Sequence, residues 1–236
     1  MGNKIRIGAL ISGGGSNLNA IIDACEGGTI DGEVVFVGTD NNNAKGLKKS
    51  SDRGYPTFAV DYASYINNYS DTNTIVPEDF DFNEISKKQN LISKDRPVDK
   101  IKKFLITRAL AEAAILKKIA DYKFDLLVLA GFMRVFTPYF IDRINRDRLK
   151  IMNIHPALLP SFPGVDGYGD TFRYGCKIGG CTVHFIDYGE DTGPIIGQKA
   201  FEILPEDTLD SVKEKGLNLE WKLFPECIQL FADGKV

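Results

Sequence analysis

Short apolar segments alternate with amphipathic segments along the chain as far as His155. The short segments have the character of strands that helices cover on both faces, and they span Lys4–Ile11, Glu33–Thr39, Pro56–Val60, Asp125–Ala130 and Leu149–Asn153. Between them, helical patterns start at Asn17, cover Ala44–Arg53 and lie around Pro138–Asn145. This alternation predicts a doubly wound, mostly parallel sheet of the α/β class.

A hairpin pattern follows after Gly164. Polar and apolar residues alternate in Gly180–Ile186, and Pro194–Ile203 is a second extended run. The connection between them, Asp187–Gly193, is rich in turn residues, which is typical of a hairpin. We therefore expect the last strands of the sheet to be antiparallel.

The last predicted element is a helix. Asp207 or Thr208 supplies its N-terminal cap, and its apolar pattern continues towards Phe231. A proline inside a helix lacks the amide hydrogen, so Pro225 is expected to interrupt this helix. The predicted fold is thus α/β, a Rossmann-like doubly wound sheet with a late antiparallel hairpin and a C-terminal helix.

Ala63–Pro97 breaks the alternation. The segment mixes many Asn, Asp, Ser and Lys residues with aromatic ones and shows little periodicity. A connection of this length is either a functional excursion or a poorly ordered insertion. We therefore predict a single domain, residues 1–236, with an insertion at about 63–97. Regular structure resumes in Val98–Tyr122 as one or two helices, with Arg108 near the start of the second.

Charge and cysteine content narrow the possible partners. A formal net charge of −3 argues against a chain held on nucleic acid by a basic surface. No apolar run is long enough to span a bilayer, and Met1–Lys4 leads directly into the first strand rather than into a signal peptide. The cysteines lack metal-ligand spacing and are interpreted as reduced thiols: Cys25, Cys176, Cys181 and Cys227. We therefore expect a cytoplasmic protein that binds small molecules and no metal.

A glycine-rich turn, Ser12–Asn17, joins the first strand to the first helix. In this order of elements, free N–H groups of the first helical turn point at an anion. Glycines also let the backbone approach a phosphate closely. The turn lacks the dinucleotide pattern GxGxxG and the lysine of a Walker loop. By itself it is weak support for phosphate binding by Gly13, Gly14, Gly15, Ser16 and Asn17.

Asn153 and His155 lie two residues apart at the end of a predicted strand. Residues at this spacing share one face of a strand, so the amide and the imidazole project together. Open α/β sheets place their ligands at such carboxyl ends, and the chain has only two histidines, His155 and His184. A buried, hydrogen-bonded histidine beside a turn asparagine is the alternative that this stretch leaves open.

Five blocks occur in a fixed order: ISGGGSNLNAIIDA (11–24), DLLVLAGFMRVFTPYF (125–140), MNIHPALLPSFPG (152–164), TVHFIDYGEDTGPII (182–196) and FADGKV (231–236). Their order resembles that of the folate-dependent formyltransferases, most closely those of purine biosynthesis that act on glycinamide ribonucleotide. The likeness covers nearly the whole chain outside Ala63–Pro97. It implies formyl transfer from 10-formyltetrahydrofolate, the co-substrate, to the amine of glycinamide ribonucleotide.

The resemblance implies that Asn153, His155 and Asp191 form the catalytic group. The Asn153 amide and a protonated His155 can donate to the oxyanion that develops on the formyl group. An Asp191 carboxylate would favour the imidazolium and hold a water that relays protons. From the residues alone, ordinary turn chemistry explains Asp191 in EDTG at least as well.

The resemblance also assigns binding residues. Gly13–Asn17 and Arg108 would hold the phosphate of the acceptor, and Glu220 would bind its ribose hydroxyls. The pterin would be held, largely by main-chain groups, at Met133, Arg134, Val135 and the turn Asp187–Asp191. Without the resemblance, we would interpret Arg108 as a solvated helix residue and Glu220 as a surface residue.

One stretch departs from the family pattern. The family usually follows Pro-Gly with a histidine-bearing segment, whereas here Asp166 and Tyr168 stand where histidines often occur. This departure puts the identity of the acceptor, or the role of the loop, in question. We expect the 63–97 insertion to be partly ordered and to pack over the rim of the acceptor side or against a second subunit. A homodimer is compatible with the sequence.

Features of the sequence oppose several other functions. A formyltransferase for a nucleotide-linked amino sugar is opposed by the glycine turn and Arg108, which suit a monophosphate. A methionyl-tRNA formyltransferase would need a basic C-terminal domain, and a formyltetrahydrofolate hydrolase an extra N-terminal one. A non-catalytic nucleotide-binding module is opposed by the joint presence of Asn153, His155 and Asp191.

Overall fold

The computed structural model describes residues 4–70 and 73–236. Residues 1–3, where we predicted a direct lead into the first strand, and residues 71–72 of the predicted insertion lie outside the described residues. The strands are β1 (Ile5–Ile11), β2 (Gly32–Thr39), β3 (Thr57–Ala59), β4 (Leu126–Leu129), β5 (Ile151–His155), β6 (Ile178–Phe185) and β7 (Ile195–Glu202). The helices are α1 (Ser16–Glu26), α2 (Lys45–Asp52), α3 (Tyr62–Asn67), α4 (Phe82–Lys88), α5 (Val98–Ile119), α6 (Pro138–Ile144), α7 (Gly167–Tyr174) and α8 (Leu209–Ala232).

The strands form one sheet in the order β3-β2-β1-β4-β5-β6-β7. Neighbours from β1 to β5 are parallel, whereas β6 is antiparallel to both β5 and β7. The predicted fold class is confirmed, including the late hairpin. Between β1 and β4 the direction of winding reverses, and at such a switch point an open α/β sheet leaves a crevice at the carboxyl ends of its strands.

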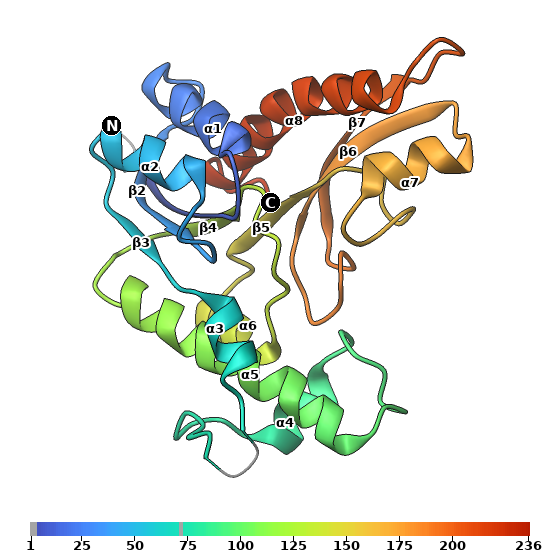
Figure 1. Ribbon diagram of the computed structural model, residues 1–236. Helices are drawn as coiled ribbons and strands as arrows, with labels where there is room; N and C mark the ends of the chain where they lie inside the picture. The colour runs from blue at the N-terminus through green and yellow to red at the C-terminus, as the bar shows by residue number, and fades with distance from the viewer. Residues whose placement is uncertain (1–3, 71–72) are drawn as a thin grey trace.

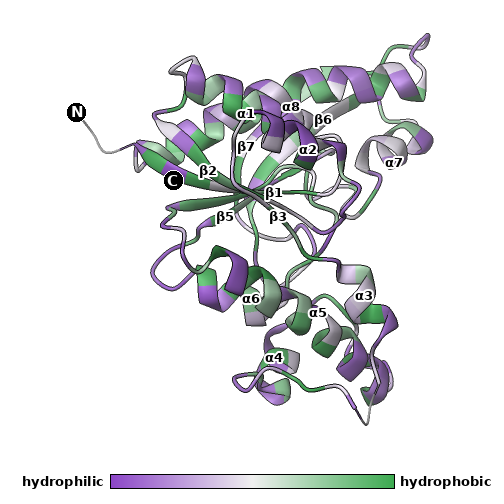
Figure 2. Ribbon diagram, turned by 60° about the vertical axis from the view of Figure 1, so that its left-hand side comes forward, coloured by the Kyte–Doolittle hydropathy of each residue, from purple (hydrophilic) through white to green (hydrophobic). Residues whose placement is uncertain are grey.

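Helices cover both faces of the sheet (Figure 1). One core joins the sheet to α1 and α8 and includes Leu18 and Phe224. The other joins it to α5 and α6 and includes Ile115 and Phe140. Figure 2 shows the hydrophobic residues of the strands between these two layers. In the part of the chain that the structure describes, no helix is long and apolar enough to cross a membrane.

α5 is one continuous helix. It has 22 residues, and Arg108 lies near its middle. Of the predicted one or two helices the structure has one, so the predicted position of Arg108 near the start of a second helix is wrong. Its sequence contains neither glycine nor proline that could end it early. Asp99 in the first turn and Lys117 and Lys118 in the last turn also have the charges that the helix dipole favours at each end.

α8 is also continuous, and the predicted interruption at Pro225 is wrong. A proline removes one backbone donor from the helix and crowds the preceding turn. Here Phe224 and Ile228, on either side of Pro225, are fully buried in the core. Burial of two such side chains contributes about 3–6 kcal/mol, enough to offset the cost of about 3 kcal/mol for the proline. The predicted cap at Thr208 is confirmed, with its side chain accepting the N–H of Ser211.

The insertion is more regular than predicted. It contains α4 and most of α3, and the side chains of Asp61 and Asp81 cap these helices by accepting N–H groups of their first turns. Ile85 of α4 packs against Ile101 and Leu105 of α5 in a small core. Aspartate followed three residues later by glutamate, as at Asp81, is an N-cap signal that could have been found in the sequence.

The insertion does not pack over the glycine-rich turn. It lies against α5, on the opposite side of the sheet from α1 (Figure 1). The physical reason is its small core, which completes the apolar face of the first half of α5. The predicted position over the acceptor side is therefore wrong, whereas packing of the insertion against a second subunit stays a prediction.

Candidate active site

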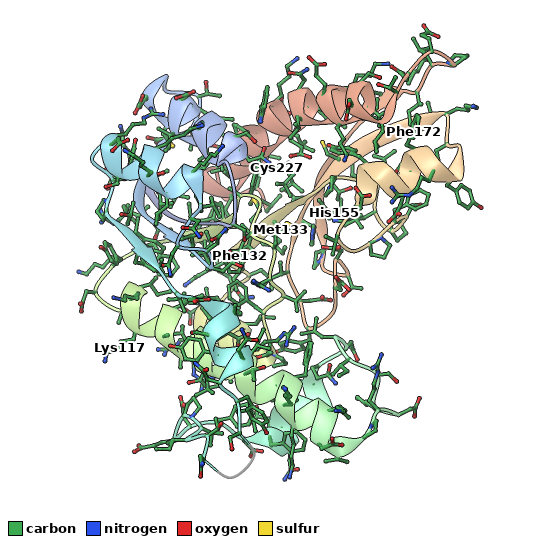
Figure 3. The ribbon with its side chains drawn as sticks, in the orientation of Figure 1. Lys117, Phe132, Met133, His155, Phe172 and Cys227 are labelled. Carbon is green, nitrogen blue, oxygen red and sulfur yellow. The ribbon has the colours of Figure 1, made fainter. Side chains whose placement is uncertain are left out.

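The predicted site residues, with the exception of Arg108, line one cavity of about 410 Å³. The cavity lies where the loops after β1, β4 and β5 meet the β6–β7 turn. Figure 3 shows His155 and Met133 on neighbouring segments in the middle of the molecule. The lining residues from these loops and from α8 include Gly13, Gly14, Gly15, Ser16, Asn17, Met133, Arg134, Val135, Asn153, His155, Asp187, Asp191 and Glu220.

The glycine-rich turn forms one end of the cavity. Gly15, with φ of 73°, has the left-handed conformation that favours glycine, and α1 starts directly after it. Among the described residues, no side chain caps the start of α1 by a hydrogen bond. The first N–H groups of the helix therefore remain available to an anion, as the sequence suggested. The N–H of Met133 donates to Ser12 Oγ at 2.8 Å, which ties this turn to the loop after β4.

Asp191 contacts His155 across the cavity. Asp191 Oδ2 lies 3.2 Å from His155 Nδ1 and accepts the Gly164 N–H at 2.8 Å. His155 Nε2 lies 2.8 Å from the Phe162 carbonyl oxygen. Carbonyl and carboxylate oxygens accept but do not donate. Both ring nitrogens therefore face acceptors, and this arrangement suits the imidazolium form of His155.

The surroundings of Asp191 keep it ionised. Burial by itself would raise the pKa of this carboxyl, but its contacts with His184, with His155 and with the Gly164 N–H outweigh burial and hold the pKa below its usual range. Asp191 also has a φ of 55°, in the left-handed region that aspartate tolerates better than most residues. An aspartate in the sequence EDTG can therefore both form the turn and present its carboxylate.

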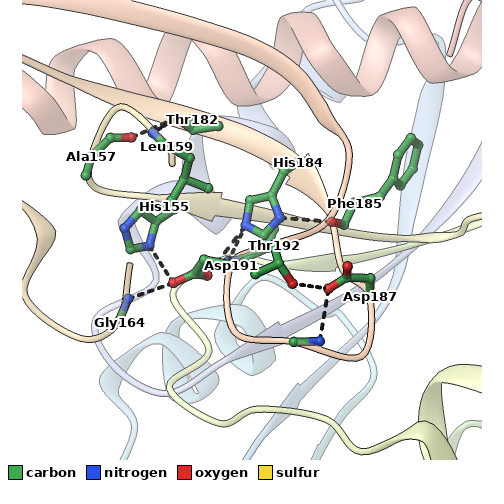
Figure 4. Close-up of polar contacts among 12 residues, drawn as sticks. His155, Ala157, Leu159, Gly164, Thr182, His184, Phe185, Asp187, Asp191 and Thr192 are labelled. Atoms are coloured by element: carbon green, nitrogen blue, oxygen red, sulfur yellow. Dashed lines mark hydrogen bonds and ion pairs between the residues drawn. The ribbon is translucent and has the colours of Figure 1, made fainter. Parts of the chain in front are cut away.

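His184 belongs to the same group, and the sequence interpretation missed it. It pairs directly with Asn153 across the antiparallel β5–β6 ladder. His184 Nδ1 donates to the Phe185 carbonyl at 2.9 Å, and its Nε2 lies 3.2 Å from the Asn153 amide nitrogen. Asp191 Oδ1 lies 3.6 Å from the same Nε2 (Figure 4). The register between β5 and β6 places His184 beside Asn153, and the residue pattern of one strand alone does not reveal that register.

Side chains of β6 and of the turn hold the loops in place (Figure 4). Thr182 Oγ1 donates to the Ala157 carbonyl and accepts the Leu159 N–H, which anchors the loop after His155. Asp187 accepts the Thr192 hydroxyl at 2.6 Å and closes the β6–β7 turn. These contacts limit the freedom of both loops that face His155.

Tyr168, Glu220 and Asn17 form a buried chain of hydrogen bonds where the glycine-rich turn meets α8 in the cavity. The Tyr168 hydroxyl donates to Glu220 Oε1 and the Asn17 amide to Oε2, each at 2.7 Å. A side chain at Gly216 would overlap the Tyr168 ring, so glycine makes room for it. Asp166 instead pairs with Arg173 and does not line the cavity. Of the two departures from the family pattern, only Tyr168 therefore reaches the site.

The formyl transferase family matches residues 5–228 of this chain. The chain belongs to this family. The formyl transferase described here is 32% identical over 218 residues to the phosphoribosylglycinamide formyltransferase of Bacillus subtilis (strain 168), across 92% of this chain and 90% of that protein. The crystal structure of glycinamide ribonucleotide transformylase 1 from Symbiobacterium toebii is 35% identical, with a TM-score of 0.77 over 99% of this chain and 90% of that chain.

The same unit also occurs within a longer protein. The trifunctional purine biosynthetic protein adenosine-3 of Gallus gallus is 30% identical over 234 residues, which are 99% of this chain and 19% of that protein. This formyl transferase therefore spans about a fifth of that relative and most of the Bacillus subtilis one.

Arg134 reaches the cavity of the formyl transferase from the loop after β4. Its Nε donates to Asp40 Oδ2 at 2.6 Å, and the guanidinium lies over the Tyr62 ring. Asp40 is buried, and this ion pair supplies its countercharge. The side chain of Arg134 is therefore positioned, although the resemblance gave this residue only a main-chain role.

Arg108 does not take part in the cavity. It lies on α5, where its guanidinium packs 3.5 Å from the centre of the Phe104 ring and donates to the Phe104 carbonyl. This is the helix on the opposite face of the sheet from α1 and the glycine-rich turn. The structure thus does not bring Arg108 to the place where the resemblance put the acceptor's phosphate.

Glu112, close to Arg108, is expected to make stability depend on pH. Burial raises the pKa of this fully buried carboxyl to about 8, although Thr137 donates two hydrogen bonds to it. The folded state thus favours the protonated form. This contribution to stability is complete below the ordinary glutamate pKa of about 4.3 and is lost as the pH rises through about 8. Glu112→Gln should remove this loss.

Urea unfolding at pH 5, 7 and 9 measures the effect. The wild type should lose unfolding free energy across this range relative to Glu112→Gln. The exposed Glu214→Gln serves as a control for the loss of one carboxyl. Parallel pH dependences in the wild type and Glu112→Gln would contradict the assignment.

Proposed function

We propose that this formyl transferase moves the formyl group of 10-formyltetrahydrofolate to the amino group of glycinamide ribonucleotide. The names of its relatives, in Bacillus subtilis and Symbiobacterium toebii, support glycinamide ribonucleotide as the acceptor of the formyl group. One observation carries the proposal: the contact between His155 and Asp191 lies in the same cavity as the uncapped start of α1. Acid–base groups and an anion site thus share one space.

The reaction places defined demands on these residues. The acceptor's amine nitrogen forms a bond to the formyl carbon, the bond from that carbon to the folate nitrogen breaks, and the proton lost by the amine ends on the leaving nitrogen. The formyl oxygen becomes an oxyanion in between, which N–H donors stabilise. The Asn153 amide, oriented by His184, and the imidazolium of His155 are the donors nearest this position.

His155 must change partner in order to act. In the structure its Nε2–H is engaged by the Phe162 carbonyl, and Asp191 holds the other nitrogen. We propose that the oxyanion replaces the Phe162 carbonyl while Asp191 keeps the ring charged and oriented. In this proposal the proton of the amine is relayed beside Asp191.

The acceptor binds between the glycine-rich turn and α8 in this proposal. Its phosphate takes the free N–H groups at Gly15–Asn17, and its ribose hydroxyls meet Glu220. Burial raises the pKa of Glu220, while hydrogen bonds from Asn17 and Tyr168 act in the opposite direction. Asn17 Oδ1 is buried and has no hydrogen-bond partner within the described chain, so a hydroxyl of the acceptor can donate to it.

Tyr168→Phe is expected to raise the KM of the acceptor about threefold to tenfold, the effect of losing one hydrogen bond to a buried acidic group. The phenyl ring keeps the space beside Gly216 filled, but Glu220 loses one of its two donors. The KM of the folate should not change. Steady-state kinetics with each substrate varied separately measures this. An unchanged acceptor KM would mean that Tyr168 only fills space.

A direct assay tests the proposed function. The purified chain is incubated with 10-formyltetrahydrofolate and either glycinamide ribonucleotide or a nucleotide-linked amino sugar, and folate release is recorded. Transfer to glycinamide ribonucleotide alone is the expected result. Transfer only to the amino sugar, or to neither acceptor, would overturn the proposal. That the enzyme works in the cytoplasm, without a metal and as a homodimer stays a prediction.

A further inference from the structure

The described part of the insertion contacts the β6–β7 turn, residues 187–193, at the edge of the proposed site. The Asn90 N–H, two residues after the end of α4, donates to the Tyr188 carbonyl at 2.8 Å. The Tyr188 hydroxyl donates to Asp142 of α6, whose other oxygen pairs with Lys88 of α4 at 2.7 Å. Figure 1 shows the tip of the β6–β7 hairpin beside the segment that follows α4. Tyr188 is thus held at both its main chain and its side chain.

The segment that contacts Tyr188 is itself rigidly built. Gln89 is fully buried, and its side-chain oxygen accepts the N–H groups of Leu91 and Ile92 at 2.8 and 2.9 Å. Its amide nitrogen donates to the Ile92 carbonyl at 3.0 Å. One buried side chain therefore organises the main chain around Asn90. The Asn90 N–H consequently points at Tyr188 without support from its own side chain, which is exposed.

The anchor behind this segment is the small core of the insertion. Ile85 is buried one turn before Gln89, against the first half of α5. Asp142, the second anchor, lies on α6, and Thr137 at the start of α6 donates two hydrogen bonds to the buried Glu112 of α5. Both partners of Tyr188 therefore rest on α5, which packs on the sheet through a different core from α8.

Tyr188 stands in the turn that carries Asp191. Asp187, Gly189 and Glu190 of the same turn line the cavity. Asp191 has a left-handed backbone and contacts His155 from this turn. The turn is a connection at the edge of the cavity, and Asp187 closes it internally by accepting the Gly189 N–H and the Thr192 hydroxyl.

We propose that the insertion is a positioning element for this turn, acting through the Asn90–Tyr188 and Lys88–Asp142–Tyr188 contacts. It sets the place of Asp191 against His155 and of the turn against the folate co-substrate. The inference rests on the proposed function for its kinetic consequences, but the bracing itself does not. The acceptor end, formed by Gly13–Asn17 and Glu220, lies apart from these contacts.

Asn90→Pro tests the main-chain contact. The substitution removes the N–H and puts a ring carbon in its place, so the Tyr188 carbonyl is both unpaired and pushed away. Gln89 already has φ of −71° and ψ of 145°, the extended conformation that the residue before a proline favours. Asn90→Ala is the matched control, because it keeps the N–H. Tyr188→Phe tests the side-chain contact, since it removes only the hydroxyl that reaches Asp142.

The kinetic result expected for Asn90→Pro and Tyr188→Phe has two parts. The KM for formyl folate should rise about threefold to tenfold and kcat should fall by a similar factor, as for the loss of one hydrogen bond. The KM for glycinamide ribonucleotide should stay at the value of Asn90→Ala. A general loss of structure would instead change both KM values and the thermal midpoint together.

Hydrogen exchange gives a readout that does not depend on catalysis. Amides of residues 187–193 should exchange faster in Asn90→Pro than in Asn90→Ala, with exchange in β5 unchanged. If exchange increases but the wild type transfers no formyl group, the bracing holds and the proposed function fails. If exchange and folate KM in both test variants equal those of Asn90→Ala, the bracing is overturned. If Asn90→Pro does not fold, exchange in residues 187–193 and the folate KM are compared between Tyr188→Phe and the wild type, and equal values overturn the bracing.

Discussion

Replacing His155 with alanine is expected to lower kcat about 10²- to 10⁴-fold, with a much smaller effect on the KM of either substrate. In the proposed reaction the imidazole donates to the oxyanion, and it is held between Phe162 and Asp191. Its loss removes a donor that matters most in the transition state, so turnover suffers more than binding.

Single-turnover and steady-state measurements of the His155→Ala variant test this expectation. A thermal midpoint close to that of the wild type is the required control, because His155 is 97% buried, with an exposed fraction of 3%. The removal of so buried a ring leaves a cavity, and a lowered midpoint would have to be separated from the chemical effect. Turnover near that of the wild type would remove His155 from the mechanism.

Replacing Asp191 with asparagine is expected to have an effect of similar size, about 10²- to 10⁴-fold on kcat. Asparagine keeps the shape of the side chain and an oxygen for the Gly164 N–H, but it removes the negative charge beside His155 and His184. The imidazolium of His155 then loses the partner that favours it. The neutral ring is a weaker donor to the oxyanion.

The pH profile separates this charge effect from a change of shape. Because the pKa of Asp191 lies below its usual range, the wild type keeps the carboxylate at neutral pH and loses activity from this group only as the pH falls through that lowered pKa. Asp191→Asn should lack this acid limb. Asp210→Asn, which removes the same charge from an exposed position outside the cavity, is the control. A normal kcat in Asp191→Asn would show that Asp191 only forms the turn and does not act in catalysis.

Much of the site could be predicted because it follows strands in sequence. The glycine-rich turn after β1, the loop after β4 and Asn153–His155 at the end of β5 each depend on a few successive residues. Parallel strands place such loops at one edge of the sheet, so these residues come together in any fold of this topology. Asp191 was placed by resemblance, and the structure shows that the antiparallel β6 returns its turn towards His155.

The predictions that failed depended on contacts between distant segments. Pro225 has a strong local preference against a helix, and the core around Phe224 and Ile228 overrides it. Arg108 has no local feature that reveals which face of the sheet α5 covers. The 63–97 insertion has a weak pattern because its small core is shared with α5 and is incomplete within its own sequence.

The sequence by itself determined the order of the strands, the helices α1, α2, α5, α6 and α8, the glycine-rich turn and the pair of Asn153 and His155, because backbone preference and side-chain alternation are local properties. Only the tertiary structure decided that His184 orients Asn153, that Tyr168 holds Glu220 and that the insertion reaches Tyr188. Each of these contacts joins segments that no local periodicity relates. They form because strand register and helix packing bring particular side chains within hydrogen-bonding distance, and that information exists only once the whole chain is folded.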